Sequence, residues 1–487
     1  MRKIKLTALL LSIAALSTAC TGQSENVTSA ASGVTGEITI SCYDTAASQA
    51  FLEEAARKFE ETYPGTKVHI DTFSQMPEIK TSEQEGEQRT VILGEDDPQG
   101  RADYISKIST SLMSGEGADL LAMDVLPIDK YVQSGQLENL KEYMDGDSSF
   151  QKSDYRENII NGLEFQNGIW FLPLDYSFNY YAYDSSLMAD QTTSEFGVNH
   201  AFTSNQLIEL GKTAYNGENC ILSAPVYISD GNGDLFSRMF RENYKEFVDF
   251  ENQTANFKDG TFEELLKTIS DMADQGYIAK GLRNTTDTGE YRESAENPTD
   301  RYLFKTKNNF SLVKETYPDP DLALMVSTSM VDNGIETDDE IGGMWSDEGN
   351  RVPFTYEQAY GINSNSKNKE TAWVFLKFLL SYEIQSSPSM SLLSLPVHNE
   401  ARMAKAESLY GMLLTETGEL DEAQRQALNA YTDAVEVMSD QINGYTVRDT
   451  TIEDMVIKEA GYYFDGSKTA DQVAQVLQNK VELYLNE

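Results

Sequence analysis

The chain has 487 residues, with 79 acidic against 38 basic side chains and a formal net charge of −41 at pH 7. A surface this acidic repels phosphate groups, which argues against nucleic acids and anionic headgroups as partners, whereas the length predicts about two to four domains. The three cysteines are too few for a disulfide framework, and the three histidines lack metal-ligand spacing, so neither a metal nor another cofactor is predicted.

Residues 1–19 have the form of a secretory signal peptide, in which basic residues precede a short apolar run and small residues follow it. The run is too short to span a bilayer, which needs about 20 apolar residues. The segment LSTAC resembles the lipobox of bacterial lipoproteins, although Ser17 stands where that motif usually has leucine. We predict acylation of Cys20 and a flexible tether over residues 20–36. The alternative is an ordinary signal peptide that is cut after Ala19, with an unmodified cysteine.

The segment after the tether predicts a parallel α/β sheet. EITISCYD alternates apolar and polar residues like a strand, AASQAFLEEAARKFEETYPG has helical spacing and ends at Pro-Gly, and KVHIDTF is a second strand. A strand–helix–strand unit of this length builds parallel sheets. Residues 76–103 are polar and acidic, and we interpret them as an irregular insertion. Cys42 and Cys220 are expected to be buried free thiols.

Further along the chain, helices and strands alternate and the tail is mainly helical. ADLLAMDV predicts a strand that is buried on both faces, and two extended pieces surround Pro173. TSNQLIELGKTAYNG and GTFEELLKTISDMADQGY predict helices, and the last helix begins at a capping box formed by Thr469 and Gln472. The final helices have no strands of their own and should pack on sheets that are already built. The predicted fold class is therefore α/β with a helical C-terminus.

Several segments together resemble the extracellular solute-binding proteins of bacterial ABC importers, in particular their carbohydrate-binding group. They are ISCYDTAASQAFLEEAARKFEETYPGTKVHI, YISKISTSLMSGEGADLLAMDV, VQSGQLENLKEYM, GINSNSKNKETAWVFLKFLLSYEIQ with LPVHNE after it, and YFDGSKTADQVAQVLQNKVELYLNE. The resemblance implies a two-lobe, periplasmic-binding-protein-like fold of type II, in which each lobe is a mainly parallel sheet flanked by helices. Hinge strands join the lobes, and the ligand is trapped in the cleft between them. By the match, lobe 1 takes residues 37–172 and 328–382, and lobe 2 takes residues 173–327 and 383–487.

The same resemblance implies a receptor that performs no chemistry. It would be a monomer, anchored by its lipid to the outer face of the cell membrane. It would capture a carbohydrate, expected to be an oligosaccharide, and deliver it to the transmembrane subunits of an ABC permease.

A carbohydrate-binding cleft needs aromatic faces for the apolar side of pyranose rings, and carboxylates or amides for the hydroxyl groups. Candidates lie where strands end or in glycine-containing loops: Tyr43, Asp44, Asp124, Asp175, Tyr176, Asn179, Phe236 and Trp345. For any single Tyr or Phe, packing in the protein is the stronger alternative. The neighbours of Trp345 are Gly, Ser, Asp and Glu, which favours ligand contact, whereas Trp373 lies on an apolar helix face and is expected in the core.

Two other interpretations concern the acidic residues. The segment DGNGD places Asp230, Asn232 and Asp234 at alternate positions as in a calcium loop, but Leu235 and Arg241 occupy the sixth and twelfth positions. We therefore predict a turn that caps a helix from Leu235. A surface glycoside hydrolase that uses two carboxylates is the rival function, and an adhesion or scaffold lipoprotein is a second rival.

Overall fold

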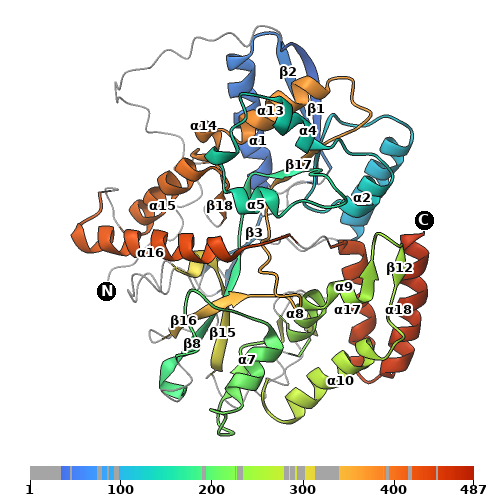
Figure 1. Cartoon of the computed structure of the whole chain (residues 1–487), viewed down its shortest axis with the longest axis vertical. Coiled ribbons are helices and arrows are strands. Elements are labelled where there is room, and N and C mark those ends of the chain that lie inside the picture. The colour runs from blue at the N-terminus through green and yellow to red at the C-terminus, as the bar shows by residue number, and fades with distance from the viewer. Residues whose placement is uncertain are drawn as a thin grey trace.

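The computed structural model contains two mixed sheets, each covered by helices (Figure 1). It describes residues 34–43, 46–73, 79–84, 87–92, 98–188, 194–224, 226–227, 234–278, 284–285, 291–292, 302–312, 339–387, 389–390, 394–414, 419–445 and 448–486. The predicted signal peptide, Cys20 and most of the tether lie outside these residues. Among the described residues, no helix combines the length and the apolar composition needed to cross a membrane.

The first sheet has the order β2-β1-β5-β17-β6, with strands at Thr66–Thr72, Gly36–Cys42, Leu120–Ala122, Ala359–Ile362 and Leu172–Pro173. Strand β1 runs parallel to β2 and β5, and β17 runs antiparallel to β5 and β6. The sheet is therefore mixed rather than uniformly parallel, because β17 enters it from the side of the other sheet. The predicted βαβ unit at the start of the chain is confirmed.

Buried aromatic and aliphatic side chains attach helices to the first sheet. In α1 (Ala46–Thr62), the predicted apolar face is in the core, and Phe51, Ala55 and Phe59 are at most 1% exposed. The ring of Phe59 meets that of Phe375 edge-on, with a centroid distance of 4.9 Å. The helices on this core are α1, α2 (Pro98–Met113), α3 (Ile128–Gln133), α4 (Leu140–Gly146), α5 (Glu157–Asn161), α13 (Lys369–Leu379), α14 (Tyr382–Gln385), α15 (Asn399–Leu414) and α16 (Glu422–Gln441).

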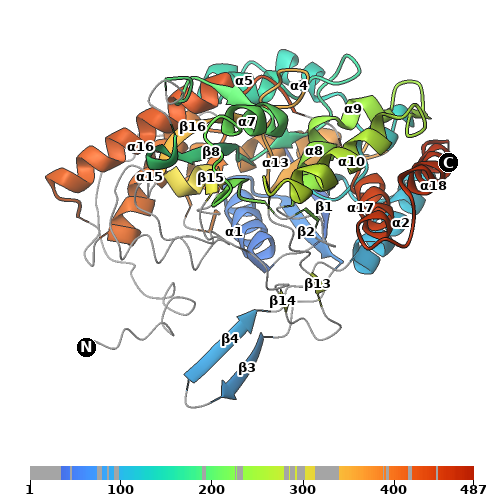
Figure 2. The same ribbon diagram turned by 90° about the horizontal axis from the view of Figure 1, so that it is seen from below.

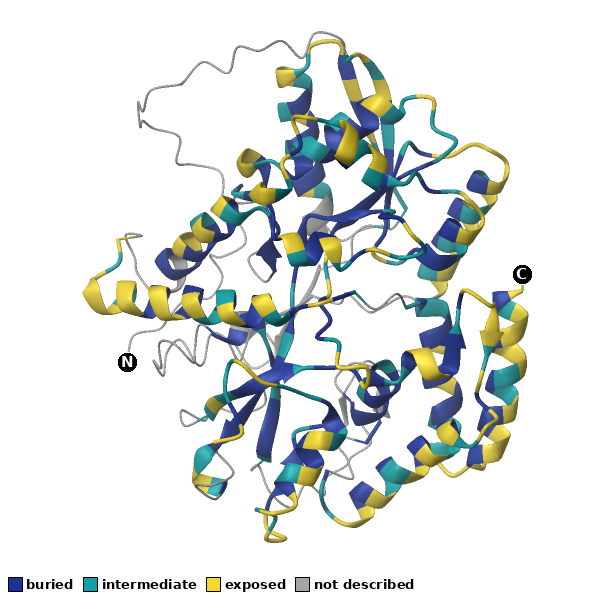
Figure 3. Ribbon diagram, in the orientation of Figure 1, coloured by how far each residue is buried: buried dark blue, intermediate teal, exposed yellow. Residues whose placement is uncertain are grey.

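The second sheet has the order β10-β15-β8-β16-β9, with strands at Cys220–Leu222, Tyr302–Asn308, Asn179–Asp184, Asp339–Trp345 and Ala201–Phe202. Strand β8 runs antiparallel to β15 and β16 because the chain arrives in it directly from the first sheet. The helices on this core are α7 (Ser204–Gly211), α8 (Leu235–Glu242), α9 (Tyr244–Phe247), α10 (Thr261–Asp274), α17 (Thr450–Phe464) and α18 (Ala470–Leu485). Figure 3 shows the strands and inner helix faces buried and the outer helix faces exposed.

The lobe boundaries stay a prediction, but the packing differs from them in two regions. Strand β16 lies in the second sheet, although the prediction assigns residues 328–382 to lobe 1. The buried side chains of α15 and α16 belong to the first core, together with the strand pair β7 (Asp175–Tyr176) and β18 (Leu395–Pro396). The prediction assigns residues 383–487 to the second lobe. The apolar face of a helix does not reveal which of two sheets it covers, so the sequence could not settle this point.

The interpretation of residues 76–103 as irregular is wrong in part. Strands β3 (Ile79–Gln84) and β4 (Glu87–Ile92) form an antiparallel hairpin, which projects from the body of the molecule in Figure 2. A hairpin that does not join a larger sheet need not alternate apolar and polar residues, so its sequence lacks the usual strand pattern. The other short pairs are β11 (Val248–Asp249) with β12 (Thr254–Ala255) and β13 (Asn284–Thr285) with β14 (Tyr291–Arg292).

Candidate functional site

Segments that pass between the two cores lie side by side and position the candidate site. One leads from β6 to β8, one from β16 to β17, and one from α16 to α17. Isolated bridges pair Ser177 with Thr355 and Pro353 with Gly444, so the three segments are joined to one another. The side chains on these crossing segments therefore lie where both lobes can reach a bound solute.

Two tyrosines on the crossing segments form an aromatic pair. The rings of Tyr356 and Tyr445 have centroids 5.5 Å apart, and both side chains are half-buried. Phe171 and Phe354 lie behind them and are fully buried, with centroids 5.4 Å from Tyr356 and 5.6 Å from Tyr445 respectively. The buried rings hold the pair in place, and both tyrosines keep part of their surface exposed to solvent.

A carboxylate adjoins this tyrosine pair. Asp124 follows the buried strand β5, and the hydroxyl of Tyr356 donates to the neighbouring carbonyl of Met123 at 3.0 Å. The side chain of Asp124 is exposed to water, yet burial raises its pKa to about 6. An ionised Asp124 can accept hydrogen bonds from hydroxyl groups.

An ion-pair network lies on the side of the second core. Arg448 donates to Glu453 at 2.9 Å, and Arg241 donates to the other oxygen of the same carboxylate at 3.2 Å. The two arginines hold the pKa of the buried Glu453 below its usual value, against the effect of burial, which is the largest influence and acts in the opposite direction. Arg448 is half-buried and also interacts with the phenol groups of Tyr356 and Tyr445. The positive charges of both guanidinium groups are thus paired with the carboxylate of Glu453.

Trp345, the tryptophan predicted to contact ligand, ends strand β16 and is half-buried against the second core. Its indole nitrogen donates to Glu242 at 2.6 Å, and the hydroxyl of Ser204 donates to the same carboxylate oxygen at 2.7 Å. Burial raises the pKa of Glu242 to about 7. This carboxyl group fixes the orientation of the indole ring, and ligand contact by Trp345 stays a prediction.

The structure places several other predicted contacts in the interior. Asp175, Tyr176 and Phe236 are fully buried, which removes the support for ligand contact by these three residues. Asp175 accepts the backbone N–H of Glu357 at 2.7 Å, and the Tyr176 hydroxyl pairs with that of Ser439 at 3.1 Å. Residues at a strand end can point inward or outward, which the sequence pattern does not distinguish.

The remaining predicted residues differ in how far they are buried. Tyr43 is half-buried beside Tyr104, with ring centroids 5.6 Å apart, and Asn179 is half-buried at the start of β8. Asp44 lies outside the described residues. Trp373 is 5% exposed, so its prediction as a core residue is confirmed.

The free thiols and the predicted helix cap can also be checked. Cys42 and Cys220 are buried free thiols, as predicted. Asp234 caps α8 by accepting the backbone N–H of Ser237 at 2.7 Å, which confirms the predicted helix cap. Asp230 and Asn232 lie outside the described residues.

The part of the chain that the structure describes has no group of three or more His, Cys, Asp or Glu side chains placed to hold a metal ion. A cavity of about 20 Å³ lies between β18, α15 and α16 and is lined by Leu395, Arg402 and Tyr431. That volume suits a single water molecule and is far too small for a sugar ring. The half-buried pair of Tyr356 and Tyr445 on the crossing segments is therefore the better candidate site.

Three residues of this site were not predicted from the sequence: Tyr356, Tyr445 and Arg448. Each tyrosine stands in a short polar stretch, PFTYEQ and NGYTVR, with the same kind of neighbours that singled out Trp345. They are 89 positions apart, and only the pairing of the crossing segments brings them together. Applying the same criterion to tyrosine would have found them.

The family model described as "Bacterial extracellular solute-binding protein" matches residues 44–386. Among solved structures, an extracellular solute-binding protein family 1 member from Alicyclobacillus acidocaldarius is similar with a TM-score of 0.52 and 14% identity, over 94% of this chain and 100% of that one. The ABC substrate-binding protein Lmo0181 from Listeria monocytogenes, solved with cycloalternan, has a TM-score of 0.51 and 14% identity, over 93% and 99%. The sugar-binding protein MalE from Xanthomonas citri has a TM-score of 0.52 and 11% identity, over 92% and 97%. No curated protein sequence matches the chain.

Proposed function

The chain belongs to the bacterial extracellular solute-binding protein family, and we propose that it is the carbohydrate receptor of an ABC transporter. It captures an oligosaccharide by closing its two lobes and delivers it to the transmembrane subunits of the permease. It acts as a monomer. It catalyses no reaction, because the family consists of solute-binding proteins. The same membership weighs against the rival glycoside hydrolase.

The aromatic pair of Tyr356 and Tyr445 next to Asp124 is the observation that carries the proposal. Sugar rings have an apolar face that packs on aromatic side chains and hydroxyl groups that need acceptors. The pair on the crossing segments provides the first, and Asp124, next to the Met123 carbonyl to which Tyr356 donates, provides the second. Trp345 is the proposed contact from the second lobe, since its ring is half-exposed and its orientation is fixed by Glu242.

The charges around the site favour an uncharged carbohydrate. Arg448 and Arg241 are paired with Glu453, and Arg351 lies 3.5 Å from Asp347. Burial and backbone N–H groups are the causes that shift the pKa of Asp124, and no described lysine or arginine is among them. A uronic acid would place a second carboxylate near this one. We propose that neutral oligosaccharides bind and that acidic ones are excluded.

We also propose that the mature protein is anchored to the outer face of the cell membrane through acylated Cys20. The segment LSTAC and the polar stretch after it support this placement. A tether of this composition would let the two lobes reach the permease while the lipid stays in the membrane.

A thermal-shift screen of the mature protein against neutral and acidic oligosaccharides tests the proposal. A ligand that binds only the folded protein adds about 2.7 kcal/mol to the free energy of unfolding at a hundred times its Kd. We expect one class of neutral oligosaccharide to raise the Tm without being hydrolysed. Hydrolysis would establish the rival enzyme, and a Tm that no carbohydrate changes would reject the carbohydrate ligand.

A further inference from the structure

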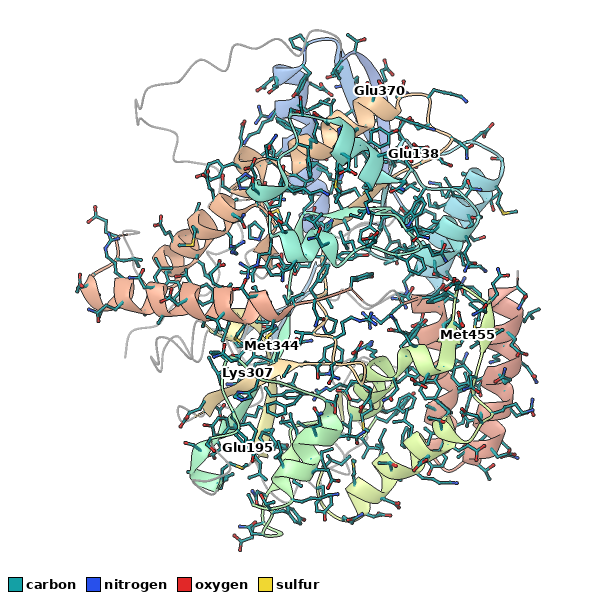
Figure 4. All side chains as sticks on the ribbon, in the orientation of Figure 1. Glu138, Glu195, Lys307, Met344, Glu370 and Met455 are labelled. Carbon is teal, nitrogen blue, oxygen red and sulfur yellow. The ribbon has the colours of Figure 1, made fainter. Side chains whose placement is uncertain are left out.

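Besides the crossing segments, the two cores meet at a second contact, which we call the seam. It lies between α2 and α3 of the first core and α17 and α18 of the second. Lys130 of α3 donates to the backbone carbonyl of Tyr484 at 2.8 Å, and its ammonium lies 3.9 Å from the ring centroid of that tyrosine. Arg101 of α2 pairs with Asp454 of α17 at 2.8 Å. Figures 1 and 2 show α2 beside α17 and α18, and Figure 4 places Met455 on the α17 side of this contact.

Two carboxyl groups from opposite cores are buried in the seam. Asp129 of α3 and Asp449, the residue that caps α17, are each 1% exposed. Asp449 is well provided with donors, since it accepts the backbone N–H of Thr451 at 2.8 Å and the hydroxyl of Tyr484 at 2.6 Å. Asp129 lacks a donor on one of its oxygens, because its Oδ1 is buried and has no hydrogen-bond partner. One carboxyl group therefore has an oxygen that lacks a donor, next to a second carboxyl group.

Buried carboxylates of like charge disfavour each other, and one of the two takes a proton. Burial is the largest cause and Asp449 the next, and together they raise the pKa of Asp129 to about 8. Burial also raises the pKa of Asp449, although Tyr484 and Lys130 act against this. The other titratable groups on which this pair acts are Tyr131, Tyr244, Tyr445 and Tyr484. Two cations lie in the seam. Arg101 is paired with Asp454, and Lys130, which acts on Asp449, already donates to a carbonyl.

We propose that the seam is a proton-coupled latch, in which Asp129 and Asp449 take up one proton when the lobes close and release it when they open. Opening the seam exposes both carboxyl groups to water, where aspartic acid ionises with a pKa near 3.9. The closed form thus binds one proton more than the open form between about pH 4 and pH 8. The ratio of closed to open protein should fall as the pH rises across this range, by up to about tenfold per pH unit for one proton. A solute that binds the closed form is held less tightly at high pH for the same reason.

The latch rests on the lobe closure in the proposed function, but it can be tested without a carbohydrate. Exposed side chains on the two sides of the seam are suitable for spin labels: Met113 at the end of α2 is 81% exposed, and Leu483 of α18 is 63% exposed. We would label Met113→Cys and Leu483→Cys in the mature chain that also carries Cys20→Ser, in which Cys42 and Cys220 are buried. The distance distribution between the labels then gives the ratio of closed to open protein from pH 5.5 to pH 8.5.

We expect this ratio to fall with pH in the labelled protein. The added substitution Asp129→Asn should abolish the pH dependence and keep the protein closed at high pH. The matched control is Glu142→Gln, which removes an exposed carboxylate of α4 in the same lobe and should leave the pH dependence unchanged. If Asp129→Asn does not fold, Asp449→Asn serves instead, since asparagine also caps helices.

A ratio that does not change with pH, or that changes equally in the aspartate variant, overturns the latch. Closure at pH 8.5 on addition of Ca²⁺ alone also overturns it, because a bridging cation would then replace the proton. None of these results depends on which solute binds. A carbohydrate screen that fails while the label distance follows pH would reject the ligand and retain the latch.

Discussion

Removing the ring of Tyr445 is the perturbation with the clearest consequence for the site. Its centroid lies 5.5 Å from that of Tyr356 and 5.6 Å from those of Phe171 and Phe354. Each aromatic pair contributes about 0.5–1.5 kcal/mol beyond the area that it buries. We therefore expect Tyr445→Ala to lower the free energy of unfolding by about 1.5–4.5 kcal/mol, the sum over three pairs.

The same substitution removes one of the two rings of the tyrosine pair. Truncating an aromatic anchor of a binding site costs about 1–3 kcal/mol, or roughly a 5- to 150-fold increase in Kd. Tyr445→Phe keeps all three ring contacts and loses the hydroxyl pair with Tyr356, at 3.4 Å, and the interaction with Arg448, so it should bind nearly as tightly as the wild type. The measurement is isothermal titration with the oligosaccharide found in the screen, at a temperature where thermal melting shows both variants folded.

Tyr382→Ala is the control for this experiment. Tyr382 is a 46% exposed tyrosine of α14 whose ring lies against His398, away from the crossing segments. It should leave the Kd unchanged. If folded Tyr445→Ala binds the oligosaccharide as tightly as the wild type, the aromatic pair is not the binding surface.

Three further predictions concern other parts of the chain. Because the acyl chain is attached to Cys20, Cys20→Ser should move the protein from the membrane fraction to the soluble fraction, and unchanged membrane association would contradict the lipid anchor. The pKa of Asp124 is about 6, and a sugar hydroxyl donates to its ionised form, so the affinity should fall as the pH drops below 6; Asp124→Asn should show no such dependence in titrations at pH 5 and pH 7. Trp373→Ala should lower the free energy of unfolding by about 3–5 kcal/mol, as large core truncations do, and leave the Kd unchanged. A weakened Kd in that variant, measured where it is folded, would show that the core and the site are coupled.

Local patterns predicted local structure well. The first βαβ unit, the capping box of Thr469 and Gln472, and the cap formed by Asp234 are all present as predicted. Each depends on residues a few positions apart, whose spacing alone determines the hydrogen bonds or the apolar face. The core position of Trp373 belongs to the same class, since its helix has one apolar face.

Properties that depend on distant parts of the chain were harder to predict. Asp175 follows the extended piece at Pro173 and Phe236 follows a glycine-containing segment, but the packing of each core turns them inward. Tyr356 and Tyr445 look unremarkable in sequence and become a pair through the contact of crossing segments. Helices α15 and α16 have apolar faces that fit either sheet, and their contacts with the first core come from the tertiary structure.

Small-angle X-ray scattering of the mature protein during a titration tests most directly whether a carbohydrate is captured between closing lobes. The ligand should be the oligosaccharide that raises the Tm most. The radius of gyration should decrease with a midpoint equal to the Kd from calorimetry, because binding to Tyr356 and Tyr445 and closure of the lobes are one event. A bound oligosaccharide that leaves the radius of gyration unchanged at saturation would contradict capture by closure.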